Sequence, residues 1–318
     1  MPAPPTQPTN FLEILQQVWW RLDVALDEEM IRWSAMLGAM EALMCGTTSI
    51  IDHHESPSCI EGSLDIIARA CDEVGVRTSL AYGVTDRHGH DGAQRGLAEN
   101  ERFLRAGGRG MVGVHAAFTC SDDTLAKAAG LAADLGIGVH IHVAEGTDDI
   151  AAGARLQPLA TDNWLLVHCV HLDRDLPGTI AHNPRSNMNN SVGYGRPAAR
   201  PNPVVLGTDG IGANMFEEAR LAYVRLREDD VMQSPDTVWA WLDEGYRFFP
   251  EARDDVVTWD YPHADSPWHV AFTTGMRPLE ITLASGQLVL SDSLPTRVDP
   301  HEVRAKAAEQ AARLFARL

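Results

Sequence analysis

The chain has 318 residues, enough to bury a large core as one domain or as a domain with an appendage. Its net charge of -18 argues against a nucleic acid as partner, because phosphate binding needs a basic surface. Five scattered cysteines without a CxxC pair fit reduced thiols better than a disulfide framework. The N-terminus has no signal-peptide pattern, and no apolar run approaches the roughly 20 residues that span a bilayer. We therefore expect a cytoplasmic protein that binds no membrane.

Two helices are predicted first, at residues 11–21 and 27–45, and strand-like and helical segments alternate after them. The clearest later helix is 121–136, with Ser121 as its N-cap and Gly136 as its stop, and another follows at 216–227. The predicted strands are 46–54, 77–86, 110–119, 138–145, 163–170, 178–184 and 203–210. Near-continuous apolar strands that alternate with helices indicate a parallel sheet covered by helices.

Nearly every predicted strand ends in polar residues. In a closed barrel of parallel strands, the carboxyl ends of many strands meet at one active face. A doubly wound sheet would concentrate its site at one crevice, usually with a glycine-rich first turn, and the sequence has no GxGxxG or Walker A motif. We therefore predict a (β/α)8 barrel of the α/β class. Seven strands are found where eight are needed, and the missing one is at the N-terminal end.

The pattern changes after residue 230. Short strands are predicted at 254–261, 268–275 and 279–292, the last as a hairpin that turns at Ser285-Gly286, and a final helix at 299–318 begins with Asp299 as N-cap. The predicted organisation is a barrel over 1–250 that lacks its first strand, a small β appendage over 251–298, and the C-terminal helix.

The stretch "GVHIHVAEGTDD" (138–149) places ionisable side chains at the end of a buried strand. His140 and His142 point to the same side of this strand, and Glu145 follows just past its end. A histidine satisfied within the core is the plain alternative to a metal ligand. His168 and Asp209 follow two other strands, however, and Zn²⁺, Fe²⁺ and Mn²⁺ all accept imidazole and carboxylate ligands. The convergence favours a metal centre at the barrel mouth.

The order "HIHVAE", "LLVHCVHL", "HNPRSNMNN" and "LGTDGIGANMFEE" resembles the amidohydrolase superfamily. Within it, the chain resembles the branch of cytosine and guanine deaminases and triazine hydrolases. It is most similar to the SsnA-like aminohydrolases, through "VWWRLDVALDEE", "TSIIDHHESP" and "RSNMNN". The resemblance runs over nearly the whole chain.

This resemblance implies one divalent metal, zinc or iron with manganese as an alternative, with His142, His168 and Asp209 at the metal. It also implies that Glu145, His168 and Asp209 are catalytic, with Glu145 carrying a proton to the ring of the substrate. His115 matches a histidine that contacts substrate, and the segment 182–187 matches a loop that lines the pocket. The predicted substrate-binding residues are His115, His182, Asn183, Arg185, Asn187 and His54. His54 could equally belong to a hydrogen-bond network at the end of its strand. Arg185 could equally hold its own loop in place.

The implied reaction is hydrolytic deamination of a purine-like N-heterocycle by a metal-bound hydroxide. Hydrolysis of a cyclic amide or of a triazine C–Cl bond is the alternative, because the same hydroxide serves all three. A truncated, metal-poor homologue without turnover is a further alternative. A small-molecule substrate and a homodimer or higher homo-oligomer are expected.

One departure from the family is that its first-strand H-x-H is missing. Possible substitutes are the pairs His88/His90 and His53/His54, and His140 beside His142, but the sequence supports none of them. We expect that Met1 is an internal methionine of a longer product or that the chain is truncated. Metal affinity is then lowered, and the open edge of the barrel must be covered by other residues.

Overall fold

The computed structural model describes residues 4–262, 266–272 and 275–318. It contains the seven predicted strands, each parallel to its neighbours and shorter than expected. They are β1 (Ser49–His54), β2 (Arg77–Tyr82), β3 (Val112–Ala116), β4 (Val139–Val143), β5 (Leu165–His168), β6 (Thr179–His182) and β7 (Val204–Leu206). β1 pairs with β2, and β3 to β7 pair in chain order; two bridges, Leu80 with Gly110 and Val84 with Val114, join the two sheets. The barrel class and the shortage of one strand are both confirmed.

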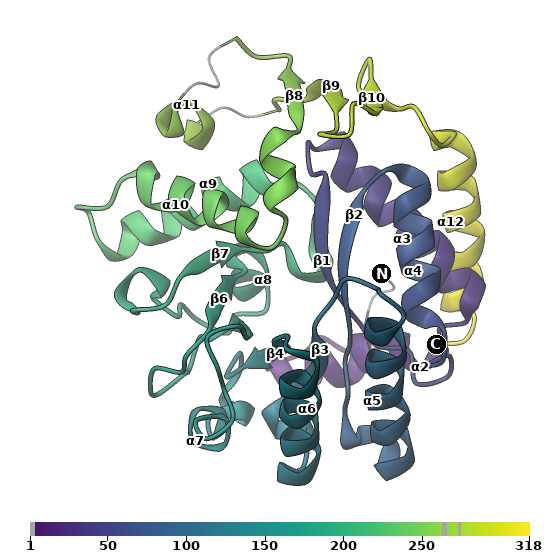
Figure 1. The fold of residues 1–318 in the computed structure, drawn as a ribbon. Helices are drawn as coiled ribbons and strands as arrows, with labels where there is room; N and C mark the ends of the chain where they lie inside the picture. Colours follow the sequence, from purple (N-terminus) through teal and green to yellow (C-terminus); the bar gives the residue numbers. More distant parts are fainter. Residues whose placement is uncertain (1–3, 263–265, 273–274) are drawn as a thin grey trace.

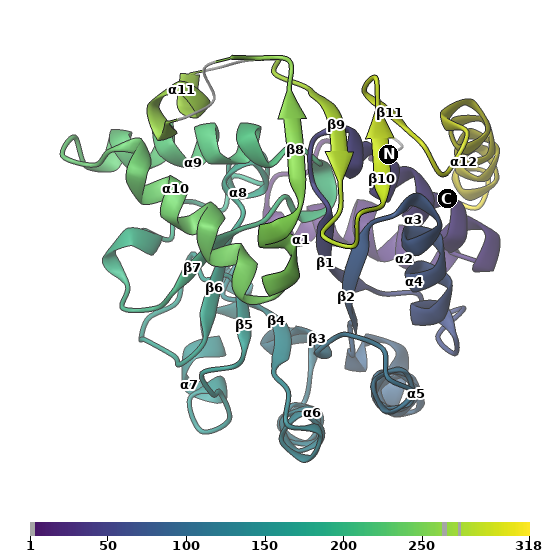
Figure 2. The same cartoon turned by 45° about the horizontal axis from the view of Figure 1, so that its top comes forward.

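Helices cover the outside of this arc of strands, as Figure 2 shows for α5 and α6. The helices that follow β1 to β4 are α4 (Ser63–Val74), α5 (Gly89–Arg105), α6 (Asp122–Leu135) and α7 (Ala152–Leu156). The side chain of Ser121 caps α6, and Gly136 ends it with a left-handed backbone, as predicted. After β7 come α9 (Met215–Asp229), which was predicted, and α10 (Pro235–Glu244), which was not. Ser234 before Pro235 is the capping signal that marks α10.

The N-terminal segment forms a helix that crosses the mouth of the barrel. It consists of α1 (Phe11–Ile14), a π-helical turn (Leu15–Trp19) and α2 (Trp20–Ala25). A Cβ at Gly146 would lie 2.7 Å from Phe11, and one at Gly210 would lie 2.9 Å from Trp19, so this helix rests on the loops that follow β4 and β7. The next helix, α3 (Glu28–Met44), begins at the predicted cap Asp27 and packs on α4 and α12.

A second, antiparallel sheet forms a separate hydrogen-bonded unit beside β1 and β2 (Figures 1 and 2). Its order is β11 (Leu294–Pro295), β10 (Leu288–Ser291), β9 (Pro278–Thr282) and β8 (Val256–Trp259), and β9 and β10 form the predicted hairpin. The C-terminal helix is α12 (Pro300–Phe315), capped by Asp299. The domain boundaries near 250 and 298 stay a prediction.

The strand predicted at 268–275 is wrong: residues 267–272 form helix α11 (Pro267–Phe272), and 273–274 lie outside the described residues. Trp268 and Phe272, four positions apart, stack on one helical face at 6.2 Å and contact Tyr223 of α9. Proline at the first position and this i,i+4 aromatic pair favour a helix over an extended run.

A cavity of about 840 Å³ takes up the place between β1 and β7, the two ends of the arc. In the part of the chain that the structure describes, neither strand has a partner on its outer side. The cavity runs from the mouth through the lumen to α3, and Phe248 and Phe249 line its lower end. Phe248 packs on a cluster of apolar residues on the barrel strands and beside them, namely Met111, Leu165, Val167, Ala181 and Val205. The open edge is therefore covered partly by aromatic residues and borders an internal space.

Across residues 4–262, 266–272 and 275–318, no helix is long and apolar enough to cross a bilayer.

Candidate active site

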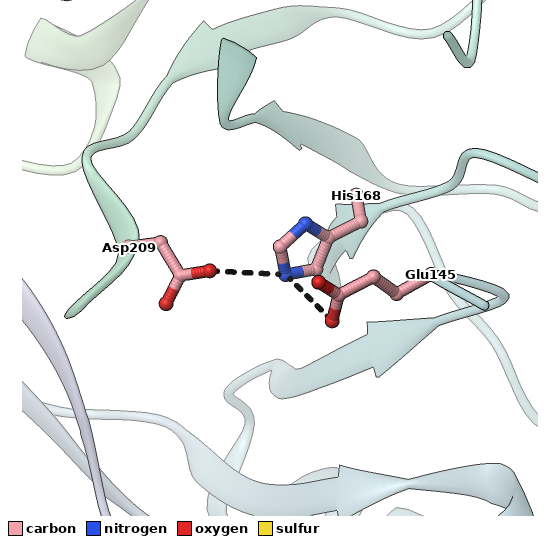
Figure 3. Close-up of side chains that lie close together, drawn as sticks. All are labelled: Glu145, His168 and Asp209. Carbon is pink, nitrogen blue, oxygen red and sulfur yellow. Dashed lines mark ion pairs between the residues drawn. The ribbon is translucent and has the colours of Figure 1, made fainter. Parts of the chain in front are cut away.

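Three of the predicted catalytic side chains meet at the mouth of the barrel (Figure 3). Nε2 of His168 lies 3.3 Å from Oε2 of Glu145 and 3.7 Å from Oδ2 of Asp209. The three come from the loop after β4, the end of β5 and the loop after β7. The ring of His142, on β4, stacks on that of His168 with centroids 5.6 Å apart. Residues up to 64 positions apart in sequence thus form one cluster, which we call the carboxylate cluster (Glu145, His168 and Asp209).

The backbone is strained where these side chains turn toward the mouth. His168, Asp209 and Ala144, the residue before Glu145, have φ angles of 71°, 52° and 46°. Non-glycine residues in this left-handed region cost about 1–3 kcal/mol each and cluster at functional sites. Because such a residue occurs at or next to each member of the carboxylate cluster, the fold holds this cluster in place at the expense of local stability.

A single helical turn after β6 supports all three members of the carboxylate cluster. In α8 (Pro184–Asn189) and its C-cap, Ser186 donates to Oδ2 of Asp209 at 2.6 Å. Asn190 donates to Oε1 of Glu145 at 3.3 Å, and Oδ1 of Asn187 lies 2.8 Å from Nδ1 of His168. The sequence reading took this segment as a pocket-lining loop and missed Ser186 and Asn190. Their i,i+4 spacing after an N-terminal proline was the available signal.

The two carboxylates of the cluster have very different acidities. Burial, then the charge of Asp209, raises the pKa of Glu145 to about 8. Burial also acts to raise the pKa of Asp209, but the electrostatic interaction with the ring of His168 and a hydrogen bond from Ser186 outweigh it, so that pKa lies below its usual value. At neutral pH Glu145 therefore holds a proton and Asp209 is ionised. A pair of carboxyl groups whose environments push their pKa values apart is the usual arrangement of a proton donor and a base.

The two histidines beside the carboxylates are oriented as metal ligands. Nδ1 of His142 lies 2.6 Å from the carbonyl oxygen of His115, which can only accept, so Nδ1 carries the proton. Nδ1 of His168 donates to Asn187 in the same way. Each ring is left with a lone pair on Nε2, the state in which imidazole binds a metal.

The cluster also has an unsatisfied polar atom that a cation would satisfy. Nε2 of His168 is buried and makes no hydrogen bond, although it faces the carboxyl groups of Glu145 and Asp209. Burial lowers the pKa of His168, so a proton does not settle there at neutral pH. An unpaired buried polar group costs about 1–3 kcal/mol. The donor set, imidazole nitrogen with carboxylate oxygen, therefore fits a divalent transition metal.

Three of the predicted substrate-binding residues line the cavity. His115 faces His142, and its Nδ1 lies 2.8 Å from the hydroxyl of Thr119. Asn183 lies beside His168, with 3.5 Å between its Nδ2 and the Nδ1 of that ring. His54 lines the outer part of the cavity, and its Nε2 lies 2.8 Å from the hydroxyl of Ser56.

The other three do not line the cavity. His182 points into the helix layer, where it contacts the rings of Tyr194 and Trp241. Arg185 is paired with Glu218 at 2.6 Å, so the geometry favours its structural reading. Asn187 contacts the site only through His168.

The possible substitute ligands fall into two groups, those away from the site and those beside it. His88 lies 3.2 Å from Glu55, and His90 is exposed and bonded to Gln94. His53 and His140 instead line the lumen beside His142.

The chain was compared with known proteins. The model of the "Amidohydrolase family" matches residues 7–239. A 5'-deoxyadenosine deaminase of Methanopyrus kandleri is 33% identical over 239 residues, which are 65% of this chain and 54% of that protein. A 5-methylthioadenosine/S-adenosylhomocysteine deaminase of Desulforudis audaxviator is 29% identical over 96% of this chain and 81% of its own length. The chain thus spans about half the length of the first of these relatives.

Solved structures of similar fold include an adenosine deaminase from Xanthomonas campestris with bound zinc. Its TM-score is 0.82 at 20% identity, covering 98% of this chain and 81% of that one. The atrazine chlorohydrolase of Arthrobacter aurescens, complexed with zinc, has a TM-score of 0.76 at 16% identity, covering 96% of this chain and 82% of that one. At these identities the likeness shows the fold alone.

Proposed function

Because the chain belongs to the amidohydrolase family, we propose that it is a metal-dependent aminohydrolase that deaminates a purine-like N-heterocycle. Hydrolysis of a C–N bond other than a peptide bond is the chemistry of this family and of the deaminases to which the chain is similar. The observation that carries the proposal is the meeting of two carboxyl groups, those of Glu145 and Asp209, around a buried imidazole nitrogen that makes no hydrogen bond.

His142, His168 and Asp209 would hold the metal. Their imidazole and carboxylate groups are ligands that suit zinc, iron or manganese. When bound, such an ion lowers the pKa of a water molecule toward neutrality. Two observations support binding of a metal here. Nε2 of His168 has no partner, and hydrogen bonds to His115 and Asn187 keep the protons of His142 and His168 on Nδ1.

The protein's own groups divide the proton transfers. Asp209, which is ionised, accepts a proton from the attacking water. Glu145, which holds a proton at neutral pH, donates it to the ring nitrogen next to the carbon that bears the amino group. Asp209 then passes its proton to the amino group, which leaves as ammonia, and Glu145 regains its proton from the hydroxyl group added to the ring, which becomes the carbonyl of the product. His168, fixed by Asn187, orients the reacting atoms.

The cavity supports a substrate of nucleoside size. Its volume of about 840 Å³ lies in the range of small-molecule sites, and aromatic side chains of the N-terminal helix line its mouth. The rings of Trp20 and His115 lie edge to face in this lining, with centroids 6.4 Å apart, and supply aromatic contact area for a flat ring. Adenosine-derived nucleosides, the compounds in the names of the two relatives, are the first candidates. A cytoplasmic location and a homo-oligomer are parts of this proposal.

The test is ammonia release by the purified chain after loading with Zn²⁺, Fe²⁺ or Mn²⁺. We expect ammonia from at least one of 5'-deoxyadenosine, 5'-methylthioadenosine and S-adenosylhomocysteine, and release about 10³-fold slower from the variant Glu145→Gln. Chloride release from a chlorotriazine, or opening of a cyclic amide, without any deamination would select one of the two alternative hydrolases. A metal-loaded chain that acts on none of these compounds would support the inactive homologue instead.

A further inference from the structure

Three imidazole rings face one another in the lumen, beside the carboxylate cluster. The ring centroid of His53, on β1, lies 4.6 Å from that of His142 and 4.9 Å from that of His140. The centroids of His140 and His142, both on β4, are 6.3 Å apart. We call these residues the imidazole cluster. It joins the strand at the open end of the arc to a strand on the far side of the lumen.

The nitrogen atoms of this cluster are largely without partners. Both ring nitrogens of His53 and Nδ1 of His140 are buried and make no hydrogen bond. His142 donates from Nδ1 to the carbonyl of His115, which leaves the lone pair of its Nε2. Buried polar atoms nearly always have a partner, and an exception calls for a ligand, an ion or a water molecule. Two imidazoles with this deficit, beside a third that keeps a lone pair on Nε2, indicate a common ligand.

The surrounding residues turn His53 into the lumen. Its ring lies over Gly83, where a Cβ would overlap its Nε2. The adjacent His54 faces the other way, against the ring of Tyr82 and bonded to Ser56. Only a glycine at position 83 leaves room for the ring of His53 above β2.

We propose that His53, His140 and His142 together bind a divalent transition-metal ion in the lumen. Imidazoles that share one ion, each at about 2.0–2.1 Å from it, have ring centres roughly 5 Å apart. The separations of His53 from His142 and from His140, 4.6 and 4.9 Å, match this value. His140 and His142 lie farther apart, at 6.3 Å, so their rings must turn toward each other to share the ion. A set of imidazole nitrogens selects zinc, copper, nickel, cobalt or iron over magnesium or calcium.

The imidazole cluster shares His142 with the site of the proposed function. The lone pair on Nε2 of His142 can bind one ion, so this is the ion that the proposed function requires, with His53 and His140 as added ligands. The inference rests on the proposed function in one respect, which is that His142 binds a metal ion. Its test therefore reads metal binding and not turnover.

The experiment titrates the metal-free chain with Co²⁺ and follows visible absorption, which reports nitrogen ligation. We expect His53→Ala and His140→Ala each to weaken binding at least tenfold. His54→Ala, which removes the neighbouring ring that faces away, should bind as the wild type does. Gly83→Ala keeps every ligand but crowds the ring of His53, and we expect it to weaken binding as well. Unchanged affinity and spectrum in His53→Ala would overturn the proposal.

Two further readouts separate ligation from folding and from catalysis. The rise in the unfolding temperature on adding Zn²⁺, measured within each variant, should be present in the wild type and His54→Ala and lost in His53→Ala. X-ray absorption of the zinc-loaded wild type should count three imidazoles or more, and His53→Ala one fewer. A chain that binds zinc in this way but releases no ammonia overturns the proposed function alone. Ammonia release with unchanged zinc ligation in His53→Ala overturns this inference alone.

Discussion

The carboxylate cluster and the imidazole cluster adjoin at His142 but are built in opposite ways. Each member of the carboxylate cluster is held by a side chain of α8 or its cap: Ser186 on Asp209, Asn187 on His168 and Asn190 on Glu145. In the imidazole cluster, neither nitrogen of His53 has a partner. The first is fixed in place before any ligand arrives, whereas the second depends on a ligand to satisfy it. Helix α8 and its cap thus position the carboxylate cluster, whereas no side chain among the described residues hydrogen-bonds to His53.

The largest effect is expected from Asp209→Asn, which keeps the shape of the side chain and removes its charge. We expect ammonia release to fall by about 10⁴-fold, because the variant loses the base for the water proton. Metal affinity should also fall, since an amide is a weaker ligand than a carboxylate. Steady-state ammonia release and metal content by mass spectrometry measure the two effects. A rate within tenfold of the wild type would remove Asp209 from the mechanism.

Glu145→Gln should lower the rate by about 10³-fold, because the amide has no acidic proton to donate. Its metal content should stay that of the wild type, which separates proton transfer from metal binding within one cluster. Loss of the metal in this variant would instead make Glu145 a ligand. The exposed His90→Ala is the matched control for handling of the protein, and its rate should not change.

The stability of the metal-free chain should fall as pH rises from 4.5 to 8, on account of Glu145. Its pKa is about 8 in the folded chain, above the usual 4.5, so the folded state keeps a proton that the unfolded state has released. This stabilising contribution of Glu145 is fully present below about pH 4.5 and lost above pH 8. Between these values the free energy of unfolding falls by up to about 1.4 kcal/mol per pH unit. Urea unfolding of wild type and Glu145→Gln at pH 6 and 7.5 measures it, because all other groups cancel in the difference. Equal pH dependence in the two chains would contradict the raised pKa.

The smallest effect should come from Ser186→Ala, which leaves both clusters in place but removes the hydrogen bond to Asp209. A positioning group of this kind is worth about 10-fold in activity or metal affinity. The acidic limb of the pH–rate profile should move to higher pH, because the pKa of Asp209 loses one cause of its lowering. Met188→Ala, an exposed change on the same helical turn, is the control. An unshifted profile would mean that Ser186 only packs there.

The sequence was sufficient to predict the carboxylate cluster, because each member follows a strand end and parallel strands bring their ends together. It could not assign the imidazole cluster. His53 and His54 are adjacent and only one can face the lumen, and that choice depends on the room above Gly83, which is distant in sequence. The prediction for the segment "WHVAF" was wrong for a related reason, because a short apolar run does not distinguish a strand from a helical turn.

The most direct test of the account is the anomalous diffraction of zinc-loaded crystals of this chain. The account predicts one strong peak in the lumen within bonding distance, about 2.0–2.2 Å, of Nε2 of His142, with His53 as a further ligand. A peak bound only by surface residues, or a lumen without any peak at saturating zinc, would contradict it.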